Sequence, residues 1–313
     1  MLKISASSIR LIIPAVSLVA LLAAVFYMQP RTMSYTGLNL LFNLAVPIAL
    51  ATVAQMIIMA VNDLDLSMGT FVSFCACVTA TYLQSDPLIG VAIFIAAILV
   101  YAVIGVLIHL RSLPSIVVTL GMSFVWAGAA VLILPSPGGS APDWVRSLMT
   151  ARPPMLPMAI VASVIIAVVA HLIVIKSPLG VLIRGVGGNV RSIERSSWSV
   201  IGIRAAAFAL AGFFAVLAGI ALVGLTTSAD ANIALRYTLL SIAGVILGGG
   251  EFVGGRVSPV GAVIGALTLT LAGSFLSFMR ISPDWQIGAQ GAILIVVLAL
   301  RILFNRVEAK GRV

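Results

Sequence analysis

The chain has 313 residues, of which 61% are apolar and only 9% are charged, and its mean hydropathy is +1.22. A soluble globular domain is about 45–50% apolar and about 25% charged, so this composition excludes an ordinary soluble enzyme, and it equally excludes intrinsic disorder. The net charge of +9 comes from basic residues that punctuate apolar runs, which indicates the cytoplasmic loops of a membrane protein and not a nucleic-acid partner.

Ten apolar segments predict ten membrane-spanning helices. They lie at 11–29, 37–61, 68–84, 88–108, 114–134, 155–175, 205–225, 236–250, 257–278 and 286–303. Most are long enough for a helix to cross about 30 Å of hydrocarbon, and their apolar runs are continuous, whereas the wall of a β-barrel alternates in polarity. The predicted fold is one all-α polytopic membrane domain over 1–313. The segments 68–84 and 236–250 are each expected to be either a full span or a short, broken helix.

The distribution of basic residues predicts which loops face the cytoplasm. The first segment follows Lys3 and Arg10, and we expect it to be an uncleaved span because its apolar run is longer than that of a signal peptide. Most of the 18 Lys and Arg residues then fall in alternate loops on the side of the N-terminus, and an excess of this kind marks cytoplasmic loops. Both termini and the long loop 176–204 are therefore predicted to be cytoplasmic, and the loop 135–154 to be periplasmic.

Motifs for nucleotide hydrolysis, metal binding and nucleophilic catalysis are missing from the sequence. No lysine lies in a G-x-x-x-x-G-K-[ST] phosphate-binding loop, and His109 and His171 have no carboxylate or cysteine close in sequence. We therefore expect no metal ion and no cofactor on this chain. All nine acidic residues lie at or near the ends of predicted helices, whereas ion-coupled transporters keep ionised groups within the membrane. This pattern argues for a neutral solute.

Uncharged polar residues inside the predicted spans form a candidate solute pathway. Gln55 and Asn62 are seven residues apart and share one helix face, and Thr119, Ser123 and Trp126 share another. Neutral hydrogen-bonding groups beside an aromatic plane suit a hydroxylated solute such as a sugar. The alternative role for these side chains is hydrogen bonding between helices.

Glycines are dense near the short segment 236–250. Gly248–Gly250 precede an acidic residue, a pattern that predicts either a hinge or a point of close packing. Gly261 and Gly265, which are four residues apart, predict close packing between helices.

A second interruption of the apolar pattern lies at 61–69. Asp65 or Ser67 is placed there to cap the helix that is expected to begin at Met68.

The loop 176–204 mixes basic residues with more apolar ones than a solvated loop needs. Stretches 178–186 and 190–201 are expected to form short helices that either lie on the membrane surface or dock on a partner. In the docking alternative, Leu182, Ile183 and Val186 are the expected anchors in a groove of the partner.

Four stretches of the chain carry motifs in a recognisable order. The loop contains SPLGVLIRGVGGN, and the earlier stretch NDLDLSMGT carries Asp65, Leu66, Ser67 and Gly69. LPSIVVTLGMSFVWAG carries Pro114, Ile116, Thr119, Leu120 and Gly121, and SIAGVILGGGEFVGGRVSPVGAVIGAL carries Gly249, Gly250 and Gly255. Together they resemble the inner-membrane permeases of bacterial ABC importers of the ribose, xylose, arabinose and galactose type, which are related to branched-chain amino-acid permeases. Asn62, Asp63 and Leu64 depart from that pattern, because they replace the paired glycines before its aspartate.

The resemblance implies a ten-span permease of the bacterial inner membrane that works as a homodimer or beside a similar permease. It also implies a cytoplasmic ABC ATPase that binds ATP and Mg²⁺, a periplasmic solute-binding protein and the membrane lipid as partners, so the chain is a transport subunit and not an enzyme. Coupling to the ATPase is expected at Leu179, Gly180, Leu182, Ile183, Arg184, Gly187, Gly188 and Asn189. The favoured solute is a monosaccharide.

Other functions stay open from the sequence alone. They are a permease for an amino acid or a furanone signal, an ion-coupled secondary transporter, and a membrane protein without a transport role.

Overall fold

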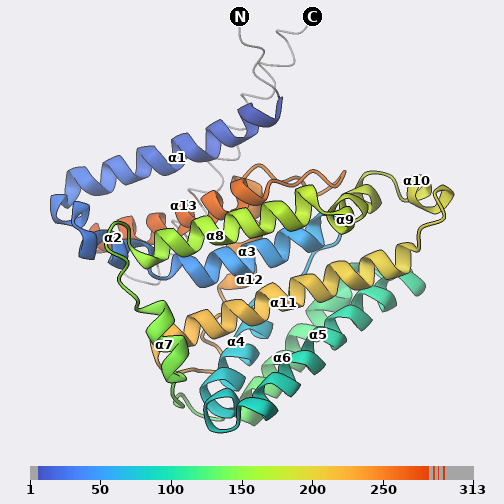
Figure 1. Ribbon diagram of the computed structural model, residues 1–313, viewed down its shortest axis with the longest axis horizontal. Coiled ribbons are helices and arrows are strands. Elements are labelled where there is room, and N and C mark those ends of the chain that lie inside the picture. Colours follow the sequence, from blue (N-terminus) through green and yellow to red (C-terminus); the bar gives the residue numbers. More distant parts are fainter. Residues whose placement is uncertain (1–5, 282–284, 286–287, 289–291, 293–313) are drawn as a thin grey trace, which may run out of the picture.

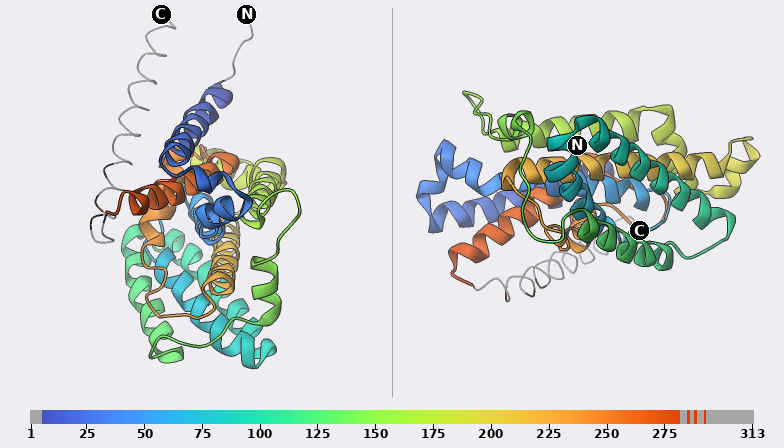
Figure 2. Two further views of the ribbon diagram at one scale, coloured as in Figure 1. Left: turned by 90° about the vertical axis from the view of Figure 1, so that its left-hand side faces the viewer. Right: turned by 90° about the horizontal axis from the view of Figure 1, so that it is seen from below.

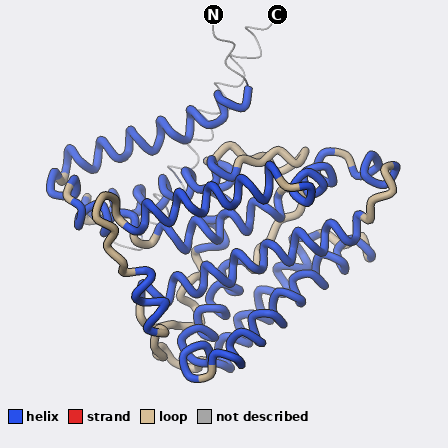
Figure 3. The backbone as a smooth tube through the Cα atoms, in the orientation of Figure 1, coloured by secondary structure: helices blue, strands red, loops and turns tan. Residues whose placement is uncertain are grey.

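The computed structural model describes residues 6–281 and the single residues 285, 288 and 292, with side chains from Pro14 onward. Within this part of the chain the protein consists of helices and loops and has no strand, as the sequence predicts (Figure 3). The tenth predicted span, 286–303, lies outside the described residues apart from two single positions.

Each of the first nine predicted spans contains a helix. The helices are α1 (Ala6–Met28), α2 (Tyr35–Phe42), α3 (Ala45–Met59), α4 (Met68–Val78), α5 (Pro87–Leu110), α6 (Ser115–Ile133), α7 (Asp143–Met149), α8 (Met158–His171), α9 (Pro178–Gly188), α10 (Val190–Arg195), α11 (Val200–Thr226), α12 (Tyr237–Leu247) and α13 (Pro259–Phe278) (Figure 1). A 3₁₀ turn, Pro30–Met33, precedes α2, and the π-helical turns Thr79–Leu83 and Leu172–Lys176 extend α4 and α8.

Six helical stretches of the described chain are long and apolar enough to cross a membrane. They are Tyr35–Met59, Pro87–Leu110, Ser115–Ile133, Met158–Lys176, Val200–Thr226 and Pro259–Phe278. The predicted spans 68–84 and 236–250 form the shorter helices Met68–Leu83 and Tyr237–Leu247, which rise about 24 Å and about 16 Å. Both fall short of about 30 Å of hydrocarbon, which favours the short-helix alternative for the two segments.

Local sequence signals explain where several helices begin. The hydroxyl oxygens of Ser177, Ser199 and Ser258 each accept a hydrogen bond from the backbone N–H three residues later, at 3.0, 3.1 and 3.1 Å. Proline follows directly at the start of α9 and α13, where its missing N–H costs nothing and its φ is already helical. These helix ends are therefore set by residues adjacent in sequence.

The long helices lie side by side, and the short helices pack against them. In Figure 1, α3, α8 and α13 run alongside one another above α11, α5 and α6, and α11 packs against both α3 and α5. The helix α4 packs against α6 and α11, while α12 packs against α3 and α13. The helix α1 lies on the outside of the bundle against α13 (Figure 2). The loops that hold α7 and α10 lie at opposite ends of the bundle (Figure 1), an arrangement compatible with the opposite sidedness predicted for 135–154 and 176–204.

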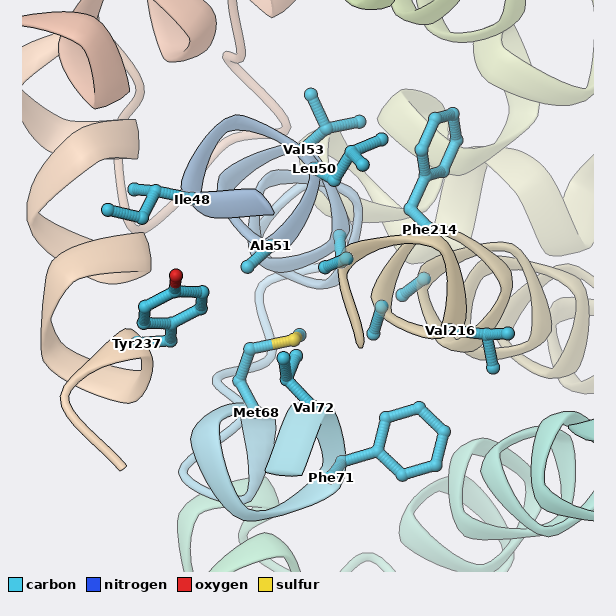
Figure 4. Close-up of a cluster of buried hydrophobic side chains, with 14 of the residues drawn as sticks. Ile48, Leu50, Ala51, Val53, Met68, Phe71, Val72, Phe214, Val216 and Tyr237 are labelled. Atoms are coloured by element: carbon cyan, nitrogen blue, oxygen red, sulfur yellow. The ribbon is translucent and has the colours of Figure 1, made fainter. Parts of the chain in front are cut away.

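The core is centred on α3, in which every residue from Ala45 to Met59 is buried. Figure 4 shows Leu50 of α3 near Phe214 of α11, with Met68 of α4 and Tyr237 of α12 completing the cluster. Lipid is as apolar as these side chains, so removal from water does not hold the helices together within a membrane. Close van der Waals packing does so instead.

The contact between α12 and α13 is made by glycines from both sides. A Cβ atom on Gly261 would collide with the carbonyl oxygen of Gly248, and a Cβ on Gly248 would collide with the carbonyl oxygen of Gly261. Further along, a Cβ on Gly265 would collide with the carbonyl oxygen of Gly244. The close packing predicted for Gly261 and Gly265 is thus confirmed, and Gly248 belongs to the same contact. Gly249 instead has a φ of +90°, a backbone conformation that favours glycine.

Gly261→Ala is expected to lower the melting temperature of the protein in detergent, because the added methyl group meets backbone atoms that have no freedom to rotate away. Overpacking of this kind typically costs about 1–3 kcal/mol. Gly121→Ala is the matched control, since a Cβ at Gly121 has no neighbour within 4 Å and alanine favours helix. Thermal unfolding of both variants measures the difference, and equal melting temperatures would show that the α12–α13 contact is loose.

Candidate functional site

The break between α3 and α4, residues 60–67, is bonded to side chains and backbone of α3, α5, α6, α9 and α11. Asn62 turns the chain with a φ of +63°, a left-handed conformation in which asparagine is enriched. Unwound backbone inside a membrane protein has to satisfy its N–H and C=O groups within the protein. Such a break therefore gathers polar side chains, and it is the candidate functional site.

Asp65 is the centre of this polar cluster and is fully buried. Its carboxylate accepts hydrogen bonds from the Ser67 N–H (2.7 Å), the Ser67 hydroxyl (2.6 Å) and the Tyr101 hydroxyl (2.7 Å). When the side-chain amide of Gln55 is oriented so that its nitrogen and its oxygen both have partners, the nitrogen donates to the Asp65 carbonyl and the oxygen accepts from the Asp65 N–H, both at 3.1 Å. A buried carboxylate is tolerated only when it is well hydrogen-bonded, and these donors meet that need.

The helix α6 holds the same break from the other side. The hydroxyl oxygen of Ser115 accepts from the Leu64 N–H at 3.1 Å, and that of Thr119 accepts from the Leu66 N–H at 3.0 Å. Thr119 in turn donates within its own helix to the Ser115 carbonyl at 2.9 Å. Two side chains one turn apart on α6 therefore replace the helical partners that residues 64 and 66 lack.

The start of α4 is not capped as predicted. Ser67 occupies the N-cap position, but its side chain makes no capping hydrogen bond, because its hydroxyl donates to Asp65 instead. Asp65 accepts from the N–H of Ser67, which precedes the helix. In the first turn of α4, the N–H of Gly69 donates a hydrogen bond to the hydroxyl oxygen of Thr238 of α12 at 2.9 Å. The capping prediction is wrong: neither the side chain of Asp65 nor that of Ser67 bonds to the first turn of α4, and Thr238, from a distant part of the chain, bonds to it instead.

An ion pair lies at the start of the break. The Arg204 guanidinium of α11 donates to the Asp63 carboxylate at 2.8 Å, and the two side chains are only 15% and 7% exposed. Burial raises the pKa of Asp63 above its usual range, and the positive charge of Arg204 opposes that rise. Together with His109 and Ser115, this pair lines a cavity of about 400 Å³.

Four aromatic rings, two on α4 itself and one each on α5 and α6, pack together beside α4. Trp126 of α6 lies with its ring centroid 4.8 Å from Phe71, 5.0 Å from Phe74 and 6.2 Å from Tyr101. Only 5% of Trp126 is exposed, and its indole N–H has no hydrogen-bond partner within the described chain. A buried indole N–H usually has a partner, and this one is unsatisfied among the described residues.

The loop 176–204 folds into α9 and α10, in agreement with the two short helices predicted there. Its buried apolar residues, however, pack on the chain's own helices and not on a partner. Ile183 and Val186 are fully buried within this chain. The expectation that they insert into a partner's groove is therefore corrected: they hold α9 on the bundle. The large apolar side chains of this loop that stay outside are Val181, 54% exposed, and Trp198, 55% exposed.

Glycines place α9 against the rest of the site. A Cβ on Gly180 would collide with the carbonyl oxygens of Ile173 and Val174, and one on Gly187 would collide with that of Ala60. A Cβ on Gly255, in the loop that follows α12, would collide with the Arg184 carbonyl oxygen. The loop after α12 and α9 therefore touch each other and the end of α3. Beside them lies a groove of about 780 Å³, lined in part by His171, Arg184 and Arg256.

The predicted site residues are thus distributed over one connected region. Gln55 and Thr119 bind the backbone of the break, and Asn62 bonds to α9. Trp126 packs over α4, and Ser123 donates to the Leu120 carbonyl of its own helix at 2.6 Å. The motif residues Asp65, Leu66, Ser67 and Gly69 form the break and the start of α4, whereas Gly249, Gly250 and Gly255 lie in the loop after α12. Of the coupling residues, Leu179, Leu182 and Arg184 are half-buried, and Gly188 and Asn189 are exposed.

Sequence analysis missed Tyr101, Ser115 and the pair of Asp63 with Arg204. Tyr101 interrupts the long apolar run 88–108, and a lone hydroxyl in such a run is a signal that it has a buried partner. The ion pair joins residues 141 positions apart, and one sequence carries no signal for such a contact.

Among the described residues, no group of three or more His, Cys, Asp or Glu side chains is placed to hold a metal ion.

Comparison with known proteins agrees with this architecture. The family described as "Branched-chain amino acid transport system / permease component" matches residues 37–298. A ribose import permease of Haemophilus influenzae is 25% identical over 294 residues, which cover 90% of this chain and 90% of the relative. An autoinducer 2 import system permease of Escherichia coli is 26% identical and covers 87% of this chain and 81% of its own length. A ribose import permease of Escherichia coli is 26% identical over 90% of this chain and 91% of its own length. No solved structure matches the chain.

Proposed function

Because this chain belongs to the family of permease components of branched-chain amino acid transport systems, and is a multi-pass permease subunit of a bacterial ABC importer in the inner membrane, we propose that its solute is a small, neutral, hydroxylated molecule, in the first place a monosaccharide. Two of its relatives are ribose import permeases. The furanone signal is the alternative favoured by the autoinducer 2 permease, and an amino acid is the alternative favoured by the family description. An ion-coupled transporter does not fit this family.

The observation that carries the solute proposal is the indole N–H of Trp126, which lies in an aromatic cluster and has no hydrogen-bond partner among the described residues. A sugar presents hydroxyl oxygens that accept from such a donor, and C–H faces that pack on aromatic rings. Phe71 and Phe74 supply the rings beside Trp126 on α4, which begins at the break, and both rings are buried in this conformation. The neutral polar residues Gln55, Thr119 and Ser123 remain the proposed lining of the pathway, whereas both hydrogen-bonding groups of the Asn62 amide are used by Gly187 and Gly254. Gln55 and Thr119 act there by holding the backbone of the break in place.

Trp126→Phe is expected to raise the KM for ribose uptake up to about tenfold in cells that carry the native importer. The substitution keeps an aromatic ring and removes one hydrogen bond, which is worth about 0.5–1.5 kcal/mol. Trp144→Phe is the control, because Trp144 lies on α7 and is 58% exposed. The initial rate of labelled ribose uptake is the measurement, with leucine and the furanone signal as competitors.

An unchanged KM in Trp126→Phe removes Trp126 from the pathway. Uptake of labelled leucine or furanone signal, with no uptake of any monosaccharide, contradicts the sugar proposal and supports the corresponding alternative.

The partners follow from the same proposal. Because this sequence has no phosphate-binding loop, ATP and Mg²⁺ are bound by a separate cytoplasmic ATPase. This ATPase docks on α9 and α10. A periplasmic solute-binding protein delivers the solute to the opposite end of the bundle, where α7 lies (Figure 1). A second permease copy completes the translocation unit. Binding of ATP by the ATPase then shifts the population of permease conformations through the docked loop.

A further inference from the structure

The side chain of Asn62 joins two segments that are remote in sequence. Its amide nitrogen donates to the Gly187 carbonyl of α9 at 2.7 Å, and its amide oxygen accepts from the Gly254 N–H at 3.0 Å. These partners lie 125 and 192 residues further along the chain. Both hydrogen-bonding functions of one amide are therefore used to hold α9 and the loop after α12 to the end of α3.

The backbone around this amide leaves little room for another arrangement. As described above, a single added carbon on Gly187 would strike Ala60, and one on Gly255 would strike Arg184. The left-handed backbone of Asn62, with φ +63°, directs its side chain into this three-way contact. Glycine and asparagine are the residues that adopt this conformation most readily.

The residues directly after Asn62 extend these contacts to the rest of the break. Asp63 pairs with Arg204 of α11 at 2.8 Å, and the Leu64 N–H bonds to Ser115 of α6 at 3.1 Å. Asp65 then accepts from Tyr101 of α5 at 2.7 Å. Consecutive residues thus bond to α9, α11, α6 and α5 in turn. The Asn62 amide is therefore one of the direct contacts between α9 and the segment that leads into α4.

We propose that Asn62 is a positioning residue that couples the movement of α9 to the break between α3 and α4. This inference rests on the proposed function, because it takes α9 to be the segment that the ATPase moves. The Asn62 amide is the direct link, and the bonds of Asp63, Leu64 and Asp65 carry the displacement to α4. Asn62 itself does not touch the solute.

Asn62→Gly is the decisive variant, because glycine keeps the left-handed turn without strain and removes both side-chain hydrogen bonds. The native importer complex, reconstituted in proteoliposomes, gives the number of ATP molecules hydrolysed per solute imported. We expect this ratio to rise by about fivefold or more. A factor of about five is the lower end of the change in affinity that coupling between two sites typically produces. The solute KM and the copurification of the ATPase are expected to stay at the wild-type level. Asn232→Gly, an exposed asparagine in the turn before α12, is the matched control.

The outcomes separate this inference from the function on which it rests. A wild-type complex without ATP-dependent uptake contradicts the proposed function. A wild-type complex that transports, beside an Asn62→Gly complex with the same ATP-to-solute ratio, overturns the inference. A raised solute KM at an unchanged ratio also overturns it, because it places Asn62 in the solute pathway.

A second variant keeps the test valid if Asn62→Gly fails to insert in the membrane. Asn62→Asp keeps an oxygen for the Gly254 N–H but places a carboxylate oxygen against the Gly187 carbonyl, so the contact with α9 alone is lost. Asn62→Asp is then expected to raise the ATP-to-solute ratio, and a ratio equal to that of wild type overturns the inference.

Discussion

Asp63→Ala is expected to lower the free energy of unfolding by about 3 kcal/mol, because it leaves the buried charge of Arg204 without its partner. Removing one member of a buried ion pair costs about 3–5 kcal/mol, and the 15% exposure of Arg204 places this pair at the lower end of that range. The measurement is thermal unfolding of the purified protein in detergent, compared with wild type.

The control for this prediction removes both charges. Asp63→Ala combined with Arg204→Met is expected to recover most of the lost stability, since an uncharged pair has no unpaired ion to bury. A double variant that is no more stable than Asp63→Ala would show that the loss comes from the shape of the break and not from the charge.

Trp198→Ala is expected to weaken copurification of the ATPase by about 2 kcal/mol, which is about 30-fold in affinity. Tryptophan is enriched among the residues that dominate interfaces, and Trp198 follows α10 with 55% of its surface exposed. Val181→Asp, on the exposed side of α9, is expected to act in the same direction by placing a charge in the apolar interface. The measurement is the fraction of ATPase retained on tagged permease at increasing salt and detergent washes.

Two comparisons make the docking prediction specific. Trp144→Ala alters an exposed tryptophan on α7, at the other end of the bundle, and is expected to leave copurification unchanged. Ile183→Asp is expected to reduce the amount of folded permease, because Ile183 is buried in its own chain. If Trp198→Ala and Val181→Asp both retain the ATPase, the loop lies on the membrane surface, as the alternative from the sequence holds.

The contrast between α3 and α6 shows why burial was not predictable from these apolar segments. In a soluble protein, a polar stripe marks the face of a helix that points to water. In a membrane, lipid and protein interior are equally apolar, so both faces are built from the same residues. The helix α3 is wholly buried, whereas only Thr119, Trp126 and Ala130 are buried in α6. The apolar sequences of the two helices do not indicate this difference.

The same limit explains the outcome for α9. Its pattern correctly predicts a short helix with apolar residues that need burial, and the Ser177 cap with the following proline sets its start. The pattern does not say whether the apolar face packs on the chain's own bundle or on a partner. The structure places Ile183 and Val186 on the bundle and leaves Val181 and Trp198 outside.

The sequence by itself determined the all-helical membrane fold, the positions of nine apolar segments, the caps that begin α9, α11 and α13, and the glycine contact at Gly261 and Gly265. Each of these depends on hydropathy, on hydrogen bonds between near neighbours, or on residue size at a regular spacing. Only the tertiary structure decided that Asn62 bonds to α9 and that Asp65 is held by Gln55 and Tyr101. Those bonds join residues from distant parts of the chain, and their partners are selected by how the helices pack.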